Sequence, residues 1–323
     1  MIQYTIWCNA SLVGPARDEL IAGCSEHRLL WDDGGGTNLD SGSPSTSLPE
    51  ADIAFGQPDP RQVIELPNLR WTHLTSAGYT RYDRPELRAA FKARGALLTN
   101  SSSVYDEPCA QHLLAFMLAQ ARQLPQAMAA QVRGEAWVYE GLRPATRVLS
   151  DQTVLILGYG AIARRLAELL KPFRLRVVAV RRDVHGDEPI ELHPIDQIDQ
   201  LLPDADHVAN ALPDNPSTRH LMNAARFGLM KAGAEFYNIG RGSTVDQEAL
   251  LEALRSGRLA AASLDVTDPE PLPASHPLWS QPNCFITPHI AGGMADEASA
   301  LVRHFLANLA NFVADRPLLD RVV

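Results

Sequence analysis

Three polar side chains in the second half of the chain each follow an apolar, strand-like run. Arg241 stands between two glycines in NIGRGS, Glu270 stands between two prolines in DPEPL, and His289 precedes small residues in TPHIAGG. An arginine guanidinium recognises carboxylates and phosphates through a planar fork of donors, and a histidine can give or take a proton near neutral pH. These residue types could bind an anionic substrate and transfer a proton to it.

Each of the three residues also has a plainer interpretation. Arg241 could be a surface ion-pair residue, Glu270 a solvated loop carboxylate, and His289 a buried structural histidine. Their shared position favours a site, because all three follow the carboxyl end of a predicted parallel strand, where open α/β sheets bind ligands. We therefore expect the three side chains to meet at one edge of a sheet.

The elements that must position these residues are predicted by apolar runs that alternate with helical segments. This alternation is typical of βαβ units and a parallel sheet, so the predicted fold class is α/β. A helix from about residue 103 to 123 is apolar on more than one face and must be buried on several sides. The Gly- and Ser-rich segment 32–47 is expected to be a mobile surface loop. Strands are predicted at 2–7, 51–56, 69–74, 96–100, 153–158, 207–213, 234–240, 261–266 and 284–289, and helices at 15–23, 246–258 and 296–313.

Length and composition limit the class of protein. A chain of 323 residues with 46% hydrophobic residues favours two domains, each with its own core. No run of 18 apolar residues is present, which argues against a transmembrane helix, and the first residues lack the features of a secretory signal. The net charge of −9 argues against a nucleic-acid-coating surface. The four cysteines are widely spaced, which argues against disulfides and a metal site and fits a reducing cytoplasm: Cys8, Cys24, Cys109 and Cys284.

A glycine turn between a strand and a helix is the clearest local motif. The first glycine permits a tight turn, the second lets the backbone approach a pyrophosphate, and the helix N-terminus holds the anion. A G-x-G-x-x-A motif is weak alone, but here it lies in a complete βαβ unit, which favours dinucleotide binding over a simple tight turn or an S-adenosylmethionine site. The turn comprises Gly158, Tyr159, Gly160, Ala161, Ile162 and Ala163.

The end of the next strand bears on which dinucleotide is bound. The run RVVAV ends in Arg181 and Arg182, with Asp183 behind. NAD enzymes place a carboxylate about 20 residues after the glycines, to bond the ribose 2′-hydroxyl. A guanidinium there would instead pair with a 2′-phosphate. The sequence therefore favours NADP over NAD, and the preference reverses if Asp183 points at the ribose.

With these motifs, the sequence resembles the D-isomer-specific 2-hydroxyacid dehydrogenase family. The resemblance runs in order, at family-like spacing, from about residue 70 onward, and the first 50 residues share only the pattern. Ala163 replaces the usual third glycine, and the two arginines stand where an acidic residue would mark NAD. The motifs are the glycine turn, N-x-x-R-G at 238–242, L-D-V-x-x-x-E-P-L at 264–272, T-P-H-I-A-G at 287–292, SAGY at 76–79, and the segments 99–118 and 211–223.

The resemblance implies a Rossmann-type dinucleotide-binding domain, residues 101–292, inserted into a flavodoxin-like substrate domain, residues 1–100 plus 293–323. The helix near 103–123 would then lie at the hinge and at a dimer contact, since homodimers are usual in the family. A cytoplasmic enzyme without metal, nucleic-acid or membrane partners is expected.

The resemblance also implies a role for each candidate residue. His289 would donate a proton to the carbonyl oxygen of a 2-keto acid, Glu270 would orient His289, and Arg241 would bind the carboxylate and polarise the ketone. Ser76, Ala77 and Gly78 would bind the substrate carboxylate from the other domain, and domain closure would exclude water. Further cofactor contacts are expected from Pro213, Thr218, Ile239 and Asp265, whereas His112 and His304 are interpreted as structural, and Tyr105 and Trp137 as either packing or substrate-contact residues.

The expected function is reduction of a small 2-keto acid by NADPH, with NAD(H) possible. Glyoxylate and hydroxypyruvate are the leading substrates by analogy, and the sequence leaves the substrate and the physiological direction open. The alternative is a dinucleotide-sensing binding protein of the same fold, similar to certain transcriptional corepressors, because fold alone does not guarantee turnover. A methyltransferase is a weaker third interpretation.

Overall fold

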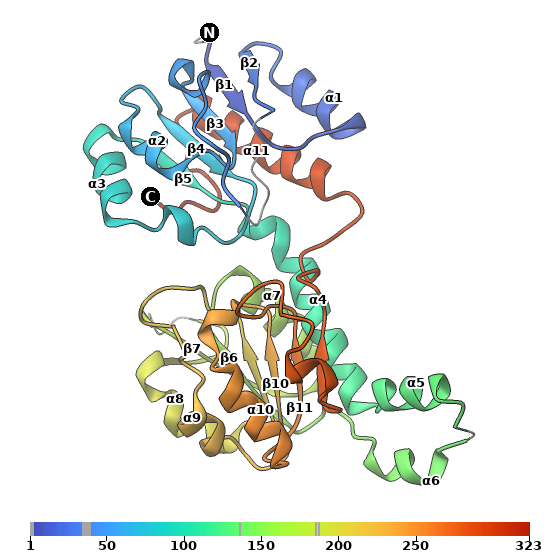
Figure 1. Ribbon diagram of the computed structural model, residues 1–323. Coiled ribbons are helices and arrows are strands. Elements are labelled where there is room, and N and C mark those ends of the chain that lie inside the picture. The colour runs from blue at the N-terminus through green and yellow to red at the C-terminus, as the bar shows by residue number, and fades with distance from the viewer. Residues whose placement is uncertain (1–2, 34–39, 136, 185, 187) are drawn as a thin grey trace. The chain divides into compact units, whose positions relative to one another are not determined.

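The computed structural model describes residues 3–33, 40–135, 137–184, 186 and 188–323 (Figure 1). The chain forms two compact units. Unit 1 comprises the chain up to Tyr105 together with Gly293–Val323, and unit 2 comprises Asp106–Gly292. The predicted loop 32–47 lies partly outside the described residues. None of the helices in the described ranges combines the length and apolar character that a membrane span requires.

Unit 1 contains a parallel sheet with the strand order β2-β1-β3-β4-β5. The order reverses beside β1, as in flavodoxin-like sheets, where ligands bind outside the carboxyl ends of the strands. The strands are β1 (Thr5–Cys8), β2 (Arg28–Trp31), β3 (Ile53–Gly56), β4 (Trp71–Leu74) and β5 (Leu97–Thr99), and the helices are α1 (Gly14–Gly23), α2 (Pro60–Glu65), α3 (Pro85–Arg94) and α11 (Glu297–Val313).

Different helices cover the two faces of this sheet (Figure 1). Successive strand residues point to opposite faces. Ile6 and Phe55 belong to an apolar cluster with α1 and α11, in which Phe55 stacks on Phe305 with 4.3 Å between ring centroids. Trp7 belongs to a second cluster that includes Phe91 of α3. The C-terminal helix is therefore part of the core of the N-terminal unit.

Unit 2 contains a second parallel sheet, with the order β12-β11-β10-β9-β6-β7-β8. The order reverses between β6 and β9, which is the Rossmann arrangement. The strands are β6 (Thr153–Leu157), β7 (Arg176–Arg181), β8 (Glu191–Pro194), β9 (His207–Asn210), β10 (Ala234–Asn238), β11 (Leu259–Leu264) and β12 (Cys284–Ile286), and the helices are α4 (Ser102–Ala121, which begins in unit 1), α5 (Leu124–Val132), α6 (Tyr139–Leu142), α7 (Ala161–Leu170), α8 (Ile198–Leu201), α9 (Ala224–Leu229) and α10 (Gln247–Arg255).

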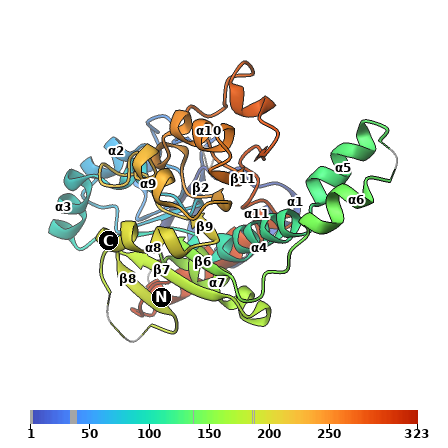
Figure 2. The ribbon, with the colours of Figure 1, turned by 90° about the horizontal axis from the view of Figure 1, so that it is seen from below.

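The interior strand β6 is apolar on both faces, as expected for a strand covered on both sides. Leu155 lies in a cluster with Phe227 of α9 and Leu250 of α10. The neighbouring residue Ile156 points to the other face, where α7 buries Leu166 (Figure 2). Both predicted features, the α/β class and the Rossmann-type unit, are confirmed.

The long apolar helix ends earlier than the sequence suggests. Helix α4 stops at Ala121, two residues before the predicted end, and Pro125 occupies the first turn of α5. A proline fits the first turn of a helix because the N–H that it lacks has no partner there. Helices α5 and α6 project from the rest of unit 2 in both views (Figures 1 and 2), and we call residues 124–135 and 137–142 the arm.

The C-terminal segment of unit 1 is tied to the start of α4 through a carboxylate. Asp320 accepts hydrogen bonds from the Ser103 N–H at 2.8 Å and from the Ser103 hydroxyl at 2.7 Å. His304 Nε2 lies 3.2 Å from the same carboxylate. Burial raises the pKa of Asp320, but the contacts with His304 and Ser103 outweigh it and hold the pKa below its ordinary value.

Asp320→Asn is expected to destabilise the protein at pH 7 by about 1–3 kcal/mol, because hydrogen bonds to a charged acceptor are lost. Since the pKa of Asp320 is lower in the folded chain than in the unfolded one, its stabilisation is present above the unfolded pKa of about 4 and is lost as the pH falls through the folded pKa. Urea unfolding at several pH values measures this. The difference from wild type should shrink below about pH 4, and Asp18→Asn on the exposed face of α1 is the control. A difference that stays constant across this range contradicts the assignment.

Candidate active site

The glycine turn joins β6 to α7 at the point where the strand order of unit 2 reverses. Gly158 has a φ of +92°, a conformation that other residues rarely adopt, and its N–H donates to the Val180 carbonyl at 2.9 Å. Gly160 precedes α7 without a side-chain cap, and open space surrounds the position where a Cβ would stand. The first N–H groups of α7 are therefore available to an anion such as a pyrophosphate.

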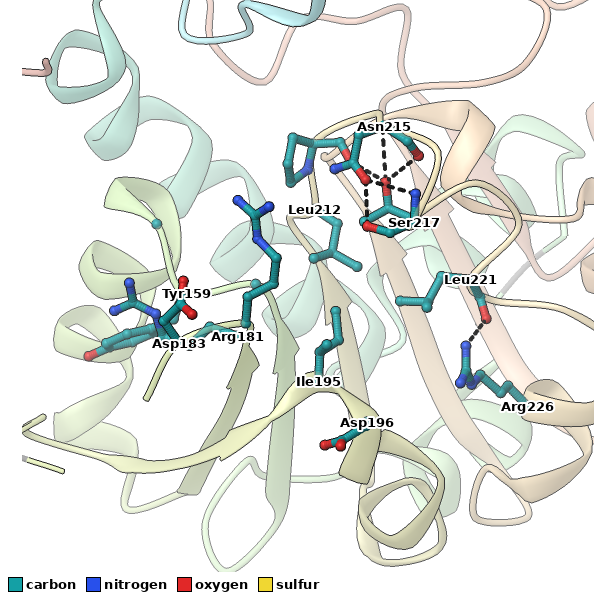
Figure 3. A pocket seen from close by; sticks show the side chains of 15 residues that line it. Tyr159, Arg181, Asp183, Ile195, Asp196, Leu212, Asn215, Ser217, Leu221 and Arg226 are labelled. Carbon is teal, nitrogen blue, oxygen red and sulfur yellow. Dashed lines mark hydrogen bonds between the residues drawn. The ribbon is translucent and has the colours of Figure 1, made fainter. Parts of the chain in front are cut away.

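A pocket of about 340 Å³ lies beside this turn (Figure 3). Its walls come from the turn, from the end of β7, from the segment after β8 and from the loop after β9. The lining residues are Gly158, Tyr159, Gly160, Arg181, Arg182, Asp183, Ile195, Asp196, Leu212, Pro213, Asn215, Ser217, Thr218, Leu221 and Arg226. The position at the switch point and the glycine turn fit a dinucleotide.

Of the residues expected to bind a cofactor, seven line the pocket: Gly158, Tyr159, Gly160, Arg181, Arg182, Pro213 and Thr218. Four others do not: Ala161 and Ile162 are the first residues of α7, and Ile239 and Asp265 are buried after β10 and β11. In Figure 3 the Arg181 side chain extends between Tyr159 and Leu212. The lining also includes the carboxylates Asp183 and Asp196, so positively and negatively charged side chains both line this pocket.

The loop 213–218 is held in shape by its own side chains. The Thr218 hydroxyl donates to the Pro213 carbonyl at 2.6 Å and accepts from the Asn215 N–H at 3.0 Å. Asn215 Oδ1 accepts from the N–H of Ser217 at 2.9 Å, and the dashed lines in Figure 3 mark this cluster. Thr218 therefore shapes the wall of the pocket through contacts within the loop.

Arg241, Glu270 and His289 follow β10, β11 and β12, which are neighbours in the sheet. The Arg241 carbonyl accepts from the Thr244 hydroxyl at 2.6 Å. At Gly242 a Cβ would stand 2.0 Å from the carbonyl carbon of Thr267, so only glycine fits. The loop that carries Arg241 thus packs directly on the loop that leads to Glu270.

Glu270 and His289 contact each other. His289 Nδ1 lies 2.9 Å from Glu270 Oε1, and the two side chains are 25% and 35% exposed, respectively. Because an ionised carboxylate can only accept, Nδ1 carries the proton in this contact. This arrangement leaves Nε2 as the nitrogen that can exchange a proton with a substrate.

The backbone around His289 is held by Asp265. His289 has a φ of +52°, and its N–H donates to the Asp265 carbonyl at 2.9 Å. The buried Asp265 carboxylate accepts from the N–H groups of Ile290 and Ala291, both at 2.9 Å, and from the Thr287 hydroxyl at 2.6 Å. Asp265 therefore anchors the segment 287–291 on both sides of His289.

In unit 1, residues 76–78 form a turn after β4. Each backbone carbonyl from residue 75 to residue 78 accepts a hydrogen bond. The carbonyl of residue 75 accepts from Tyr105 Oη at 2.9 Å, and that of residue 76 accepts from the Ser101 N–H at 3.1 Å. The carbonyl of residue 77 accepts from Asn100 Nδ2 at 2.7 Å, and that of residue 78 accepts from the Ser76 hydroxyl at 2.7 Å. Within the ranges that the structure describes, the N–H groups of Ala77 and Gly78 donate to no acceptor. The turn thus presents N–H donors with its own acceptors satisfied, which suits an anion.

Gln57, which supports this turn, is a residue that sequence reasoning missed. Gln57 is 1% exposed, and its Nε2 donates to Thr75 Oγ1 at 3.1 Å and to Ser76 Oγ at 3.0 Å. Its only sequence signal is its position, directly after the apolar run of β3. The pocket residues Ile195, Asp196 and Arg226 could not be predicted from the sequence, because none of them belongs to a motif.

Residues 114–291 match the NAD binding domain of the D-isomer specific 2-hydroxyacid dehydrogenase family. Over 236 residues the chain is 35% identical to glyoxylate/hydroxypyruvate reductase B of Escherichia fergusonii. The aligned region covers 72% of this chain and 71% of that enzyme. Over 258 residues it is 32% identical to glyoxylate reductase of Aeropyrum pernix, covering 77% and 75%, respectively.

The fold is similar to that of a D-isomer specific 2-hydroxyacid dehydrogenase from Xanthobacter autotrophicus solved with NADPH and MES. The TM-score is 0.80 at 26% identity, and the match covers 100% of this chain and 98% of that one. These matches favour the dehydrogenase interpretation over the binding-protein and methyltransferase alternatives.

Proposed function

We propose that this chain, which belongs to the D-isomer-specific 2-hydroxyacid dehydrogenase family and is an NAD(P)-dependent oxidoreductase that acts on 2-hydroxy acids, reduces a small 2-keto acid. Glyoxylate and hydroxypyruvate are the leading substrates in this proposal. The contact between His289 and Glu270 is the observation that carries this proposal. The names of the relatives support the choice of substrates.

The proposed chemistry needs a proton at the carbonyl oxygen and a hydride at the carbonyl carbon. A bound nicotinamide cofactor supplies the hydride. His289 Nε2 supplies the proton, while Glu270 accepts from Nδ1 and fixes the orientation of the ring. The same pair takes the proton back when a hydroxy acid is oxidised.

Two groups are proposed to bind the anionic end of the substrate. Arg241, whose Nη1 donates to the Gly240 carbonyl at 2.6 Å, would offer its remaining guanidinium donors to the carboxylate and polarise the ketone. The N–H groups of Ala77 and Gly78 in unit 1 are proposed as further donors. The carbonyls of the same two residues already accept hydrogen bonds, which holds the turn in place. In this scheme unit 1 is the substrate domain and unit 2 is the dinucleotide-binding domain.

NADPH is proposed as the preferred reductant, with NADH as the weaker one. Arg181 and Arg182 line the pocket next to the glycine turn, where they can pair with a 2′-phosphate. The relative from Xanthobacter autotrophicus was solved with NADPH. Asp183 and Asp196 also line the pocket and would serve a ribose hydroxyl, so the preference needs a direct measurement.

The double variant Arg181→Ala with Arg182→Ala is expected to weaken NADPH binding by about 10²-fold or more, since each charge-assisted hydrogen bond contributes about 1.5–3 kcal/mol. NADH binding should change by less than about threefold. Quenching of protein fluorescence by each cofactor measures both affinities. Equal losses for NADPH and NADH would refute the proposed preference.

The activity itself is tested by the absorbance of NADPH in the presence of glyoxylate, hydroxypyruvate and longer 2-keto acids. We expect turnover that is fastest with the short keto acids. Cofactor binding without turnover of any keto acid would refute the proposal and favour a dinucleotide sensor.

A cytoplasmic homodimer completes the proposal. The arm exposes large apolar side chains, with Met128 66% exposed and Val132 and Trp137 each 88% exposed. Several large apolar side chains exposed on one projecting segment favour an interaction site, and a second copy of the chain is its proposed partner. The mass of the protein in solution, measured by light scattering, tests the dimer.

A further inference from the structure

Helix α4 brings a polar side chain to the segment that carries His289. His112 Nε2 lies 3.1 Å from the Thr287 hydroxyl and 3.8 Å from Asp265 Oδ1. Its ring packs edge-to-face on Phe116, with 4.6 Å between ring centroids. The ring is thus held by packing on one side and faces the Thr287–Asp265 hydrogen bond on the other.

The direction of these hydrogen bonds follows from what each group can do. Asp265 as a carboxylate can only accept, so the single proton of the Thr287 hydroxyl goes to Oδ1, 2.6 Å away. Thr287 Oγ1 therefore accepts from His112, and His112 Nε2 carries a proton. Burial lowers the pKa of His112 while the Asp265 charge opposes this, so the ring is neutral at pH 7.

The chain of hydrogen bonds ends at the backbone of His289. Asp265, only 2% exposed, holds residues 289–291 by three backbone contacts. A buried carboxylate depends on its full set of donors, and each donor polarises the next one. Loss of the His112 donor would leave the Thr287 oxygen without this hydrogen bond, and would thereby weaken the polarised Thr287–Asp265 hydrogen bond and loosen the Asp265 anchor.

We propose that His112 is a positioning residue for His289: its Nε2–H donates to Thr287, locks the Thr287–Asp265 hydrogen bond, and so keeps His289 in its left-handed backbone conformation against Glu270. This inference rests on the proposed role of His289 as proton donor. His112 touches no reacting atom in this scheme and acts only through Thr287 and Asp265. The segment that it holds ends two residues before the chain leaves unit 2 at Gly293.

The test compares His112→Ala and His112→Gln in the full-length protein. In His112→Ala we expect kcat with NADPH and glyoxylate to fall about tenfold or more, while KM and the NADPH affinity stay within about twofold, because binding groups are untouched. His112→Gln places an amide N–H near the former Nε2 and should recover most of kcat. Gln111→Ala, on the exposed side of the same turn, is the control and should match wild type.

A double-mutant cycle with Thr287→Val separates positioning from general damage. If His112 acts through Thr287, the double variant should lose no more kcat than the worse single variant. Additive losses, or a His112→Ala enzyme with wild-type kcat, would overturn the proposal. If the His112→Ala chain does not fold, His112→Gln and Thr287→Val still test the proposal. A kcat well below wild type in His112→Gln, or a wild-type kcat in Thr287→Val, would overturn the proposal.

A readout without turnover distinguishes this inference from the proposed function. In 15N-histidine-labelled protein, the backbone amide signal of His289 should move in His112→Ala and return towards wild type in His112→Gln. If those signals behave so while His289→Ala retains activity, the positioning is supported and the proposed proton donor is wrong. An unmoved His289 signal in His112→Ala overturns the positioning itself.

Discussion

His289→Ala is expected to lower kcat by about 10²- to 10⁴-fold, which is the usual contribution of a positioned general acid. The loss should fall on kcat, because the ring donates the proton in the transition state and Arg241 still holds the carboxylate. NADPH affinity should remain within about twofold, since His289 does not line the nucleotide pocket. Stopped-flow kinetics with NADPH and hydroxypyruvate, together with fluorescence titration of NADPH, measures both quantities.

Two further variants define this result. His27→Ala removes a half-buried histidine from unit 1 and should leave kcat unchanged. Glu270→Gln keeps the shape of the partner at 2.9 Å but removes its charge, so we expect a smaller loss than in His289→Ala. Turnover of His289→Ala near the wild-type level would exclude His289 as the proton donor and, with it, the mechanism proposed for this site.

Arg241→Lys is expected to reduce kcat/KM by about 10²-fold or more, although the charge is kept. A lysine ammonium is a point charge on a flexible stem and cannot reproduce two parallel hydrogen bonds to a carboxylate. The backbone cannot adjust to compensate, because Gly242 already packs against Thr267 with no space for a Cβ. Steady-state kinetics with glyoxylate at saturating NADPH measures the loss.

A matched substitution controls for the change of side chain alone. Arg28→Lys alters an exposed arginine that pairs with Glu50 at 3.0 Å on the surface of unit 1, and exposed pairs contribute little. This variant should have wild-type kinetics. Full activity of Arg241→Lys would remove Arg241 from the site and leave the turn at residues 76–78 as the proposed carboxylate-binding group.

The strands that were predicted correctly are those with strong apolar runs. TVLIL and RVVAV form the interior strands β6 and β7 of the unit 2 sheet, each paired with a neighbour on both sides, and their apolar runs are continuous. The two missed strands, β2 with RLLW and β8 with ELHP, are edge strands with exposed or half-buried side chains. An edge strand is formed by pairing with its neighbour, and a short local pattern does not record that pairing.

The same division applies to the site. The positions of Arg241, Glu270 and His289 after strands could be predicted, because parallel strands bring their carboxyl ends to one edge. The pocket wall at Ile195 and Asp196 could not, since it comes from the segment that follows the missed strand β8. The contact between His112 and Thr287, at 3.1 Å, could not be predicted either, because the two residues lie 175 positions apart in the chain.

The α/β class, the glycine turn between β6 and α7, and the family of the chain could all be predicted from the amino-acid sequence, because each depends on residues close together along the chain. Three facts came only from the folded chain: Glu270 contacts His289, Asp265 anchors the backbone around His289, and the N–H groups of Ala77 and Gly78 find no acceptor among the residues that the structure describes. Those facts depend on which distant donors and acceptors pair in the folded chain. Hydrogen bonds act over about 3 Å, so their pairing is fixed only when packing brings separate segments to that distance.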